Sequence, residues 1–551
     1  MKRSIVCCVL LLGLATSGWG QSSPVSHAPL LDTLGEHHRP VTTDSRLAQS
    51  YFDQGLRFIY GYYFTEAVAS FREAIRLDPN CAMAYWGMAL AIGPNPNSRY
   101  FQMPDDPTGE GRKAIERAVS LSDGASDKER AFIDALAKRY APTDREQRDQ
   151  AYMVAMRQLF HRYPDDPDAG MFYADSLMTM SPWTYWGADG EPYFPGTLEA
   201  SAALESIVEQ FPQHPGANHL YIHLMENSQT PEQALPHADR LAQFMPGLGH
   251  MVHMPGHIYL RVGQYEKAIL TNRASVVADQ EMAVVWADHE YPATVPSGGA
   301  SHVAHPRHAR AFIRFAATMQ GRYSLAMEVS REMAAGMSVE WLADDGSAQK
   351  AYVNPWLTSR RFGKWQEVLE QAAPSGAPPY VQGIWHFVRG NALAATGRLG
   401  EAEQALDEVR ANAEVASGLR VVVNTDRRLL TLASELLAGQ IAFYDGRTED
   451  SLRHLETAVR MEDGLNYMEP PDWGLPVRHW LGAVLLESAR PEAAELVYWE
   501  DLRRNPENVW SLFGLLQSLN AQDKPRIAAQ VEERFKRAGA RADVVLTSSR
   551  F

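Results

Sequence analysis

The sequence predicts an all-α solenoid built from helix-turn-helix repeats, on three observations. The chain has 551 residues, which is too long for a single hydrophobic core. Its composition is that of an ordinary globular protein, with 45% hydrophobic and 22% charged residues, so a collagenous or mainly disordered chain is excluded. A helix-turn-helix unit recurs at about 34 residues, so the chain gains length by adding repeats rather than by enlarging one core.

The first 20 residues are predicted to be a signal peptide. Lys2 and Arg3 precede an apolar run from Ile5 to Ala15, and small residues at positions 18 and 20 suit cleavage. The run is well short of the roughly 20 residues that span a bilayer, and no later segment qualifies, so no transmembrane anchor is expected. We therefore expect an exported protein, periplasmic or secreted, whose mature chain begins with a polar tail over residues 21–44.

A single cysteine remains after this cleavage. Cys7 and Cys8 lie inside the predicted signal peptide, and Cys81 is the third of the chain's 3 cysteines. A lone cysteine cannot form an internal disulfide, so the exported fold must be stable without one. A large helical core would provide that stability.

The repeat is visible in small residues where two helices touch and in prolines where a second helix ends. Gly55, Ala67 and Pro79 have this spacing, and Ala234 and Ala268 lie 34 residues apart. The same frame fits further stretches, namely residues 215–246, 249–274, 320–327, 389–406, 438–459 and 481–506. These units divide into an N-terminal half, residues 45–282, and a C-terminal half, residues 307–551.

Two stretches interrupt the repeat frame. Loops rich in proline, glycine and aromatic residues break the helices between residues 82 and 200. Residues 283–306 are too many for one repeat turn, so this insertion is either a lid or a tethered surface loop. The aromatic residues of the first stretch either wall a pocket or anchor a buried loop; they are Trp183, Tyr185, Trp186, Tyr193 and Phe194.

Histidines concentrate in one part of the chain. Of the 18 histidines, 11 fall between residues 214 and 308, where an even spread would place about 3. His219, His223 and Glu226 follow the i, i+4, i+7 spacing that places side chains on one helix face. The N-terminal half is therefore predicted to carry a stripe of potential metal ligands.

A second stripe follows one repeat later. His250, His253 and His257 have i, i+3, i+7 spacing and share a face if the segment is helical throughout. If the helix instead begins at Pro255, His250 and His253 lie on the entering loop, where periodicity no longer implies that they converge.

The chemistry of these residues favours a transition metal. Imidazole suits zinc, copper, iron and nickel, and Glu226 can serve as a ligand or as a catalytic general base. Met225, Met251 and Met254 stand near the histidines, either as soft ligands for copper or as gap-fillers in the core. The candidate metal ligands are His219, His223, Glu226, His250, His253, His257, His305 and His308, with copper or zinc as the expected ion.

The recurring small residues and prolines make most of the chain resemble the tetratricopeptide repeat family. The resemblance implies a concave groove lined by the first helix of each repeat. With Pro246 as repeat position 32, the residues of both stripes occupy groove positions, and His308 falls at a groove position of a later repeat. Because neighbouring helices pack about 8 to 10 Å apart, the imidazoles of adjacent first helices could converge on one or two metal ions.

The chain also resembles a narrower group, the exported and largely uncharacterised bacterial tetratricopeptide proteins. The likeness rests on HPGANHLYIHLMENS and GHMVHMPGHIYLRVGQY, on PWTYWGADGEPYFPGTLE, on AHPRHARAF with its paired histidines, and on the segment that begins PVRHWLGAVLLESARP. This group implies no established reaction.

Charge and missing motifs narrow the function classes. A net charge of −15 argues against a nucleic-acid partner, and no phosphate loop, GxSxG, HExxH or CxxC motif is present. We hypothesise a solenoid with a His/Glu metal site in its groove, acting as a metal-dependent hydrolase or a copper oxidoreductase. The alternative is a metal-free scaffold that binds a peptide, a partner protein or a small molecule in the groove.

Overall fold

The computed structural model describes residues 28–187, 189–287, 289, 300–303 and 305–551. In these residues the chain is all-α, and extended pairing is limited to the bridges Trp186–Pro192 and Arg420–Thr425. The predicted signal peptide and much of the 283–306 insertion lie outside the described residues. The fold class predicted from the sequence, a tetratricopeptide-like solenoid, is confirmed.

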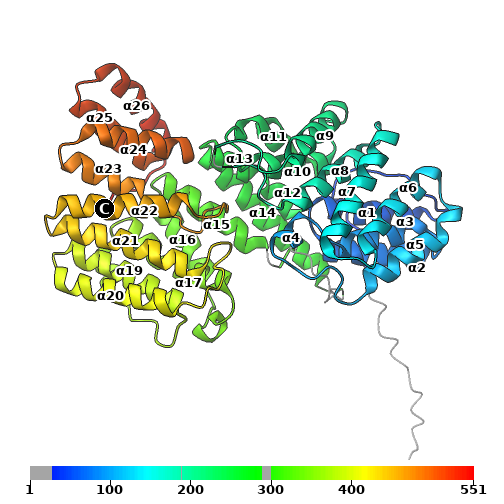
Figure 1. Ribbon diagram of the computed structural model, residues 1–551, viewed down its shortest axis with the longest axis horizontal. Helices are drawn as coiled ribbons and strands as arrows, with labels where there is room; N and C mark the ends of the chain where they lie inside the picture. The colour runs from blue at the N-terminus through cyan, green and yellow to red at the C-terminus, as the bar shows by residue number, and fades with distance from the viewer. Residues whose placement is uncertain (1–27, 188, 288, 290–299, 304) are drawn as a thin grey trace, which may run out of the picture.

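Helices pack in consecutive antiparallel pairs along the chain (Figure 1). The helices of the N-terminal half are α1 (Arg46–Tyr60), α2 (Phe64–Leu77), α3 (Ala82–Ile92), α4 (Pro96–Tyr100), α5 (Glu110–Leu121), α6 (Asp127–Ala137), α7 (Arg145–Arg162), α8 (Pro167–Met180), α9 (Gly196–Gln210), α10 (Pro215–Met225), α11 (Leu235–Phe244), α12 (Gly249–His253), α13 (Pro255–Arg261) and α14 (Tyr265–Trp286). Those of the C-terminal half are α15 (His305–Met319), α16 (Tyr323–Ala334), α17 (Gly346–Arg361), α18 (Trp365–Leu369), α19 (Pro379–Ala395), α20 (Leu399–Val415), α21 (Asp426–Tyr444), α22 (Thr448–Asp463), α23 (Arg478–Glu487), α24 (Pro491–Arg504), α25 (Val509–Ala521) and α26 (Pro525–Ala538).

Glycines allow the close helix approach that the repeat pattern predicts. A Cβ atom at Gly55 of α1 or Gly87 of α3 would collide with the ring of Phe71, which lies on the intervening helix α2. The same arrangement recurs near the C-terminus, where the ring of Tyr498 on α24 lies against Gly482 and Gly514. An aromatic ring of one second helix thus sits between glycines of two successive first helices, and this packing fixes the repeat geometry.

The described part of the predicted polar tail packs on the N-terminal repeats. Leu34 is fully buried in the core. Arg39 is also buried, and its guanidinium donates to the carboxylates of Asp166, at 3.0 Å, and Asp168, at 2.7 Å. Ser45 then caps α1 by accepting from the backbone N–H of Ala48.

The C-terminal half curls back toward the N-terminal half. Trp510 of α25 donates its indole N–H to the carbonyl of Thr318 in α15 at 2.8 Å, and its ring belongs to the N-terminal hydrophobic core. Asp543 accepts from the backbone N–H groups of Tyr323 and Ser324, where α16 begins. α15 packs against α14 of the N-terminal half (Figure 1). Glu469, in a loop of the C-terminal half, reaches His257 of the N-terminal half, with 3.4 Å between its Oε2 and the imidazole Nδ1.

No helix among the described residues combines the length and apolar character needed to cross a bilayer.

Candidate metal centre

Three helical segments bring the predicted histidines together. His219 and His223 lie one turn apart on α10, and His305 begins α15, which also carries His308. The stripe from His250 to His257 spans α12 and α13.

This last stripe stays helical through the proline. Met254, between the two helices, has helical dihedral angles, with φ −52° and ψ −36°, and its N–H bonds the His250 carbonyl at 2.9 Å. Pro255 therefore occupies the first position of α13 without turning the chain, because a proline there needs no N–H partner. The helical alternative for His250 and His253, which the sequence left open, is the one that the structure adopts.

His219, His223 and His250 form the first cluster, which we call site A. Each of the three side chains offers a ligand atom within 4.8 Å of those offered by the other two. All three residues are buried. Site A is thus a closed set of three imidazoles from two neighbouring repeats.

The hydrogen bonds of site A determine which ring nitrogen is available. His219 Nδ1 lies 2.5 Å from the carbonyl oxygen of Tyr60, and His250 Nδ1 lies 2.9 Å from that of Gly61. A carbonyl oxygen only accepts, so both Nδ1 atoms carry the hydrogen and both Nε2 atoms carry a lone pair. His223 Nδ1 likewise donates to Glu226 Oε1 at 2.9 Å.

The Nε2 atoms of His219 and His223 are buried and have no hydrogen-bond partner among the described residues. A buried polar atom without a partner is costly, and it calls for an explanation such as an ion. Metal-binding histidines commonly donate their other ring N–H to a carbonyl or a carboxylate, as all three residues of site A do. The donor set fits a transition metal ion held through Nε2.

His253, His257 and His308 form a second cluster, site B, again with ligand atoms within 4.8 Å of one another. His253 Nδ1 lies 2.6 Å from Asn272 Oδ1. Since Asn272 uses its amide N–H to donate to the Ala268 carbonyl, Oδ1 is the acceptor and His253 Nδ1 the donor. His253 Nε2 therefore carries a lone pair.

Two histidines of site B, His253 and His257, lie close together. His257 donates from Nδ1 to Glu226 Oε2, and its Nε2 lies 2.8 Å from His253 Nε2. Two lone pairs at that separation repel unless a proton or a cation lies between them. Burial lowers the pKa of His257, but the carboxylates of Glu226 and Glu469 outweigh burial and raise it to about 9. The contact can therefore hold a proton, and it can equally hold a metal ion.

Glu226 connects the two sites. Its Oε1 accepts from His223 of site A and its Oε2 from His257 of site B. Burial raises the pKa of Glu226, but His257 and His223 outweigh this effect and hold it at about 2. The carboxylate is thus charged and orients one imidazole of each site. It also forms a third group of potential ligands with His257 and Glu469.

Residues that the sequence analysis missed complete the surroundings. The ring of Tyr62 stacks over His223 and contacts His219 and His250, with centroid distances of 5.7, 4.8 and 5.9 Å. Tyr62 has a φ of 62°, a conformation that is uncommon for a residue other than glycine. Tyr62 lies some 160 residues before site A in the sequence, so no local sequence pattern links it to these histidines.

His305 lies between the two sites. Its ring centroid is 5.3 Å from that of His250 and 4.9 Å from that of His253. His305 Nδ1 donates to Asp279 Oδ2 at 2.7 Å, and its buried Nε2 has no hydrogen-bond partner in the described chain. His305 therefore shows the same pattern as the histidines of site A.

A further group of possible ligands, His37, Asp168 and His214, has a different character. Asp168 already accepts from the guanidinium of Arg39 and from the hydroxyl of Tyr60. The Arg39 cation balances the charge of the Asp168 carboxylate, so we interpret this group as a structural hydrogen-bond network rather than as a cation site.

The concave face that the repeat frame predicts is covered where the histidines lie. The side chains that were expected to line it are between 0% and 6% exposed; they are His219, His223, Glu226, His250, His253 and His257. The turn between α1 and α2 covers site A, and α15 with the Glu469 loop covers site B. The repeat frame gives the face on which a side chain lies, but segments far away in sequence close over that face.

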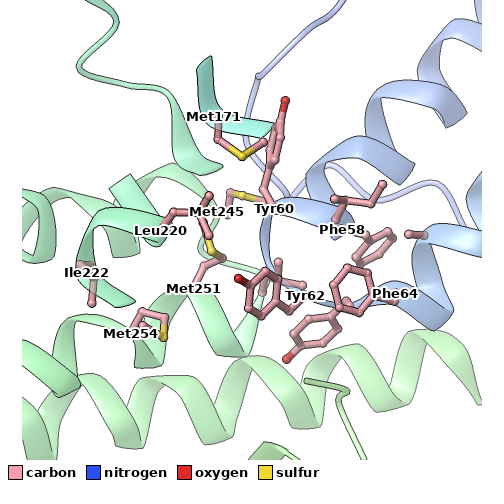
Figure 2. Packing of buried hydrophobic residues seen from close by; sticks show 14 of the residues in the cluster. Phe58, Tyr60, Tyr62, Phe64, Met171, Leu220, Ile222, Met245, Met251 and Met254 are labelled. Atoms are coloured by element: carbon pink, nitrogen blue, oxygen red, sulfur yellow. The ribbon is translucent and has the colours of Figure 1, made fainter. Parts of the chain in front are cut away.

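The neighbouring aromatic and methionine side chains are mostly part of the core. Tyr185 is buried, and Trp186 donates its indole N–H to the Leu224 carbonyl at 2.7 Å, while the ring of Trp183 contacts His223 at 4.9 Å. Figure 2 shows Met251 and Met254 within the apolar cluster that also contains Leu220 and Ile222 of α10. These methionines fill the core beside the histidines.

Comparisons with known proteins leave the family open. Neither a family model nor a curated protein matches the sequence. Among solved structures, the chain is similar to the human IFIT1 dimer with m7Gppp-AAAA, at 11% identity and a TM-score of 0.32 over 91% of this chain and 92% of that one. It is also similar to Cut9 of the APC/C Cut9–Hcn1 hetero-tetramer assembly (12%, 0.30, 91% and 76%) and to yeast Tom70 (11%, 0.28, 88% and 92%). Similarities this low carry no conclusion about function.

Proposed function

We propose that the protein is an exported tetratricopeptide-like metalloprotein that binds copper or zinc through His219, His223 and His250. The observation that carries the proposal is that three imidazoles converge at one buried point. The Nδ1 atom of each donates a hydrogen bond, so its Nε2 lone pair is available to a metal ion. Three neutral imidazoles are a donor set that both ions accept.

An ion held by three protein ligands keeps a coordination position open, which supports Lewis-acid or redox chemistry on a small substrate. Glu226 orients His223 through its Oε1, so its contribution to site A is to position an imidazole. Export is supported by the charged, apolar and small-residue segments of the first 20 residues.

A metal-free peptide scaffold is less well supported. A peptide in a groove must touch the side chains that recognise it, whereas the site A histidines are at most 6% exposed. Burying His219 and His223 with Nε2 atoms that have no partner in the described chain would destabilise a scaffold and bring no gain in peptide binding.

The experiment measures metal content by mass spectrometry on protein purified without an affinity tag from metal-replete cells. We expect about one or more equivalents of copper or zinc per chain, and loss of the site A equivalent in a variant that combines His219→Ala and His223→Ala. His237→Ala is the matched control, since His237 is a buried histidine of the same half that bonds Asn218.

Less than about one tenth of an equivalent in the folded wild-type protein would overturn the metal proposal. Partner binding that depends on His219 and His223 without any metal would favour the scaffold. Recovery from the periplasm or the medium, with a mature chain that begins near Gln21, would support export, and an intact cytoplasmic chain would contradict it.

A further inference from the structure

We propose that site A and site B are loaded together, so that the protein holds a centre of two transition metal ions. The inference rests on the proposed function, because it assumes that site A binds metal, and it adds a second ion held by His253, His257 and His308. The ligand that site B would take is the same borderline-soft divalent ion that site A takes.

Site B resembles site A in its donor set, but the Nε2 atoms of His253 and His257 lie within hydrogen-bond distance of each other, whereas those of His219 and His223 have no partner in the described chain. His253 and His257 both donate from Nδ1, to Asn272 and to Glu226, and so present Nε2 lone pairs to each other at 2.8 Å. His308 lies against both rings, with centroid distances of 4.7 Å to His253 and 5.9 Å to His257. A metal ion between these nitrogens removes the repulsion of the facing lone pairs.

Histidines of the two sites are in direct contact. His250 of site A and His253 of site B have ring centroids 5.9 Å apart, and so do His223 and His257. His305 lies between them with an unpartnered Nε2, which could complete the coordination of either ion. Two ions held by these histidines would therefore be close neighbours, as in two-metal centres, where the ions lie about 4 Å apart.

The buried charges are compatible with two ions. All the imidazole ligands are neutral when they coordinate, so the positive charge of the ions needs nearby anions. Three buried carboxylates lie around the sites. Glu226 places one oxygen against each site, Asp279 holds His305, and Glu469 lies 3.4 Å from His257 Nδ1. Against three carboxylates, one divalent ion leaves a net charge of about −1 and two ions leave about +1, so the carboxylates can balance most of the charge of two ions.

Metal titration of the chelator-treated full chain with Cu(II) alone, and separately with Zn(II) alone, tests the inference. We expect two equivalents in the wild type, and one each in His219→Ala and in His308→Ala. His308 is the better choice for site B, because His257→Ala would also release Glu226, which orients His223 of site A. His237→Ala should retain two equivalents. Circular dichroism of each variant verifies that the helices are intact.

Electron paramagnetic resonance of the Cu(II) form adds a readout that folding alone does not change. Two neighbouring Cu(II) ions should interact magnetically, and either single-site variant should give the spectrum of an isolated ion. One equivalent in the wild type, lost in His219→Ala but not in His308→Ala, would overturn the two-ion centre and leave the proposed function standing. No bound metal in the folded wild type would overturn both.

Discussion

Buried histidines are used differently in two regions of the molecule, the candidate metal centre and the repeats that follow α15. In the C-terminal half, His479 accepts from the guanidinium of Arg361 at 2.8 Å through Nδ1 and donates to Asp501 Oδ2 at 2.9 Å through Nε2. In the N-terminal half, His219 and His223 each commit one nitrogen and leave the other without a partner. Burial is similar in both regions. A structural histidine is therefore distinguished from a potential ligand by whether its second ring nitrogen has a hydrogen-bond partner.

The helix interfaces show the same contrast. In the C-terminal half, Gly383 and Gly390 of α19 allow Leu430 and Leu437 of α21 to approach closely, which gives an apolar contact between neighbouring first helices. In the N-terminal half, the corresponding contact between α10 and the α12–α13 segment carries the imidazoles of sites A and B. One repeat architecture thus supports either apolar packing or a polar centre at the same kind of interface.

The largest expected effect concerns His479. His479→Ala leaves a cavity and removes the hydrogen bonds to Arg361 and Asp501, so we expect a loss of about 3–5 kcal/mol in the free energy of unfolding. Metal content per folded chain should not change. Denaturant unfolding with metal analysis of the folded fraction measures both quantities. His454→Ala, at a half-buried site paired with Glu435, is the control and should cost at most about 1 kcal/mol. A drop in bound metal per folded chain for His479→Ala would contradict the distinction between structural histidines and metal ligands.

A smaller effect is expected for the carboxylate that links the two sites. Glu226→Gln keeps the shape of the side chain but weakens its hydrogen bonds to the Nδ1 atoms of His223 and His257. Metal affinity should therefore fall roughly 10–100-fold. Competition with a chelator of known affinity measures the change. Glu462→Gln is the matched control, because Glu462 accepts from the Val477 backbone and does not touch the histidines. Equal affinities for wild type and Glu226→Gln would show that the carboxylate plays no part in binding.

The smallest effect concerns pH. Burial, with neighbouring imidazoles as a lesser cause, holds the pKa of His219 and His250 well below the usual value of about 6.5. A lowered pKa means that these rings stay neutral at lower pH, so protons displace the metal only below pH 6.5. Metal retention in His308→Ala, which isolates site A, should therefore have its midpoint at a lower pH than that of a surface histidine site. A midpoint at or above about 6.5 would mean that site A is open to water.

Sequence patterns were sufficient for the repeat frame and for the helices that carry the histidines. The spacing of Ala234 and Ala268 and the small residue Gly55 follow from the need of helix pairs to touch, which is a local requirement. The i, i+4 spacing of His219 and His223 likewise places them on one face of α10. The roles of these residues as metal ligands stay predictions.

Other parts of the candidate site left no local pattern. Tyr62, the carbonyls of Tyr60 and Gly61, and Glu469 reach the histidines from distant repeats. A periodic pattern relates residues within one helix or between adjacent repeats, so it cannot show which remote loop covers a face. The pattern therefore predicted the face on which the histidines lie, but not the segments that cover it.

The sequence by itself determined an all-α repeat array and a face rich in imidazoles, because both depend on residue spacing along the chain. Only the tertiary structure decided that this face is closed, that Glu226 spans two clusters, and that Nδ1 rather than Nε2 is committed in His219 and His250. The link through Glu226 joins two neighbouring repeats, and the committed Nδ1 atoms depend on hydrogen bonds to carbonyls more than 100 residues away, which form only when the repeats pack together.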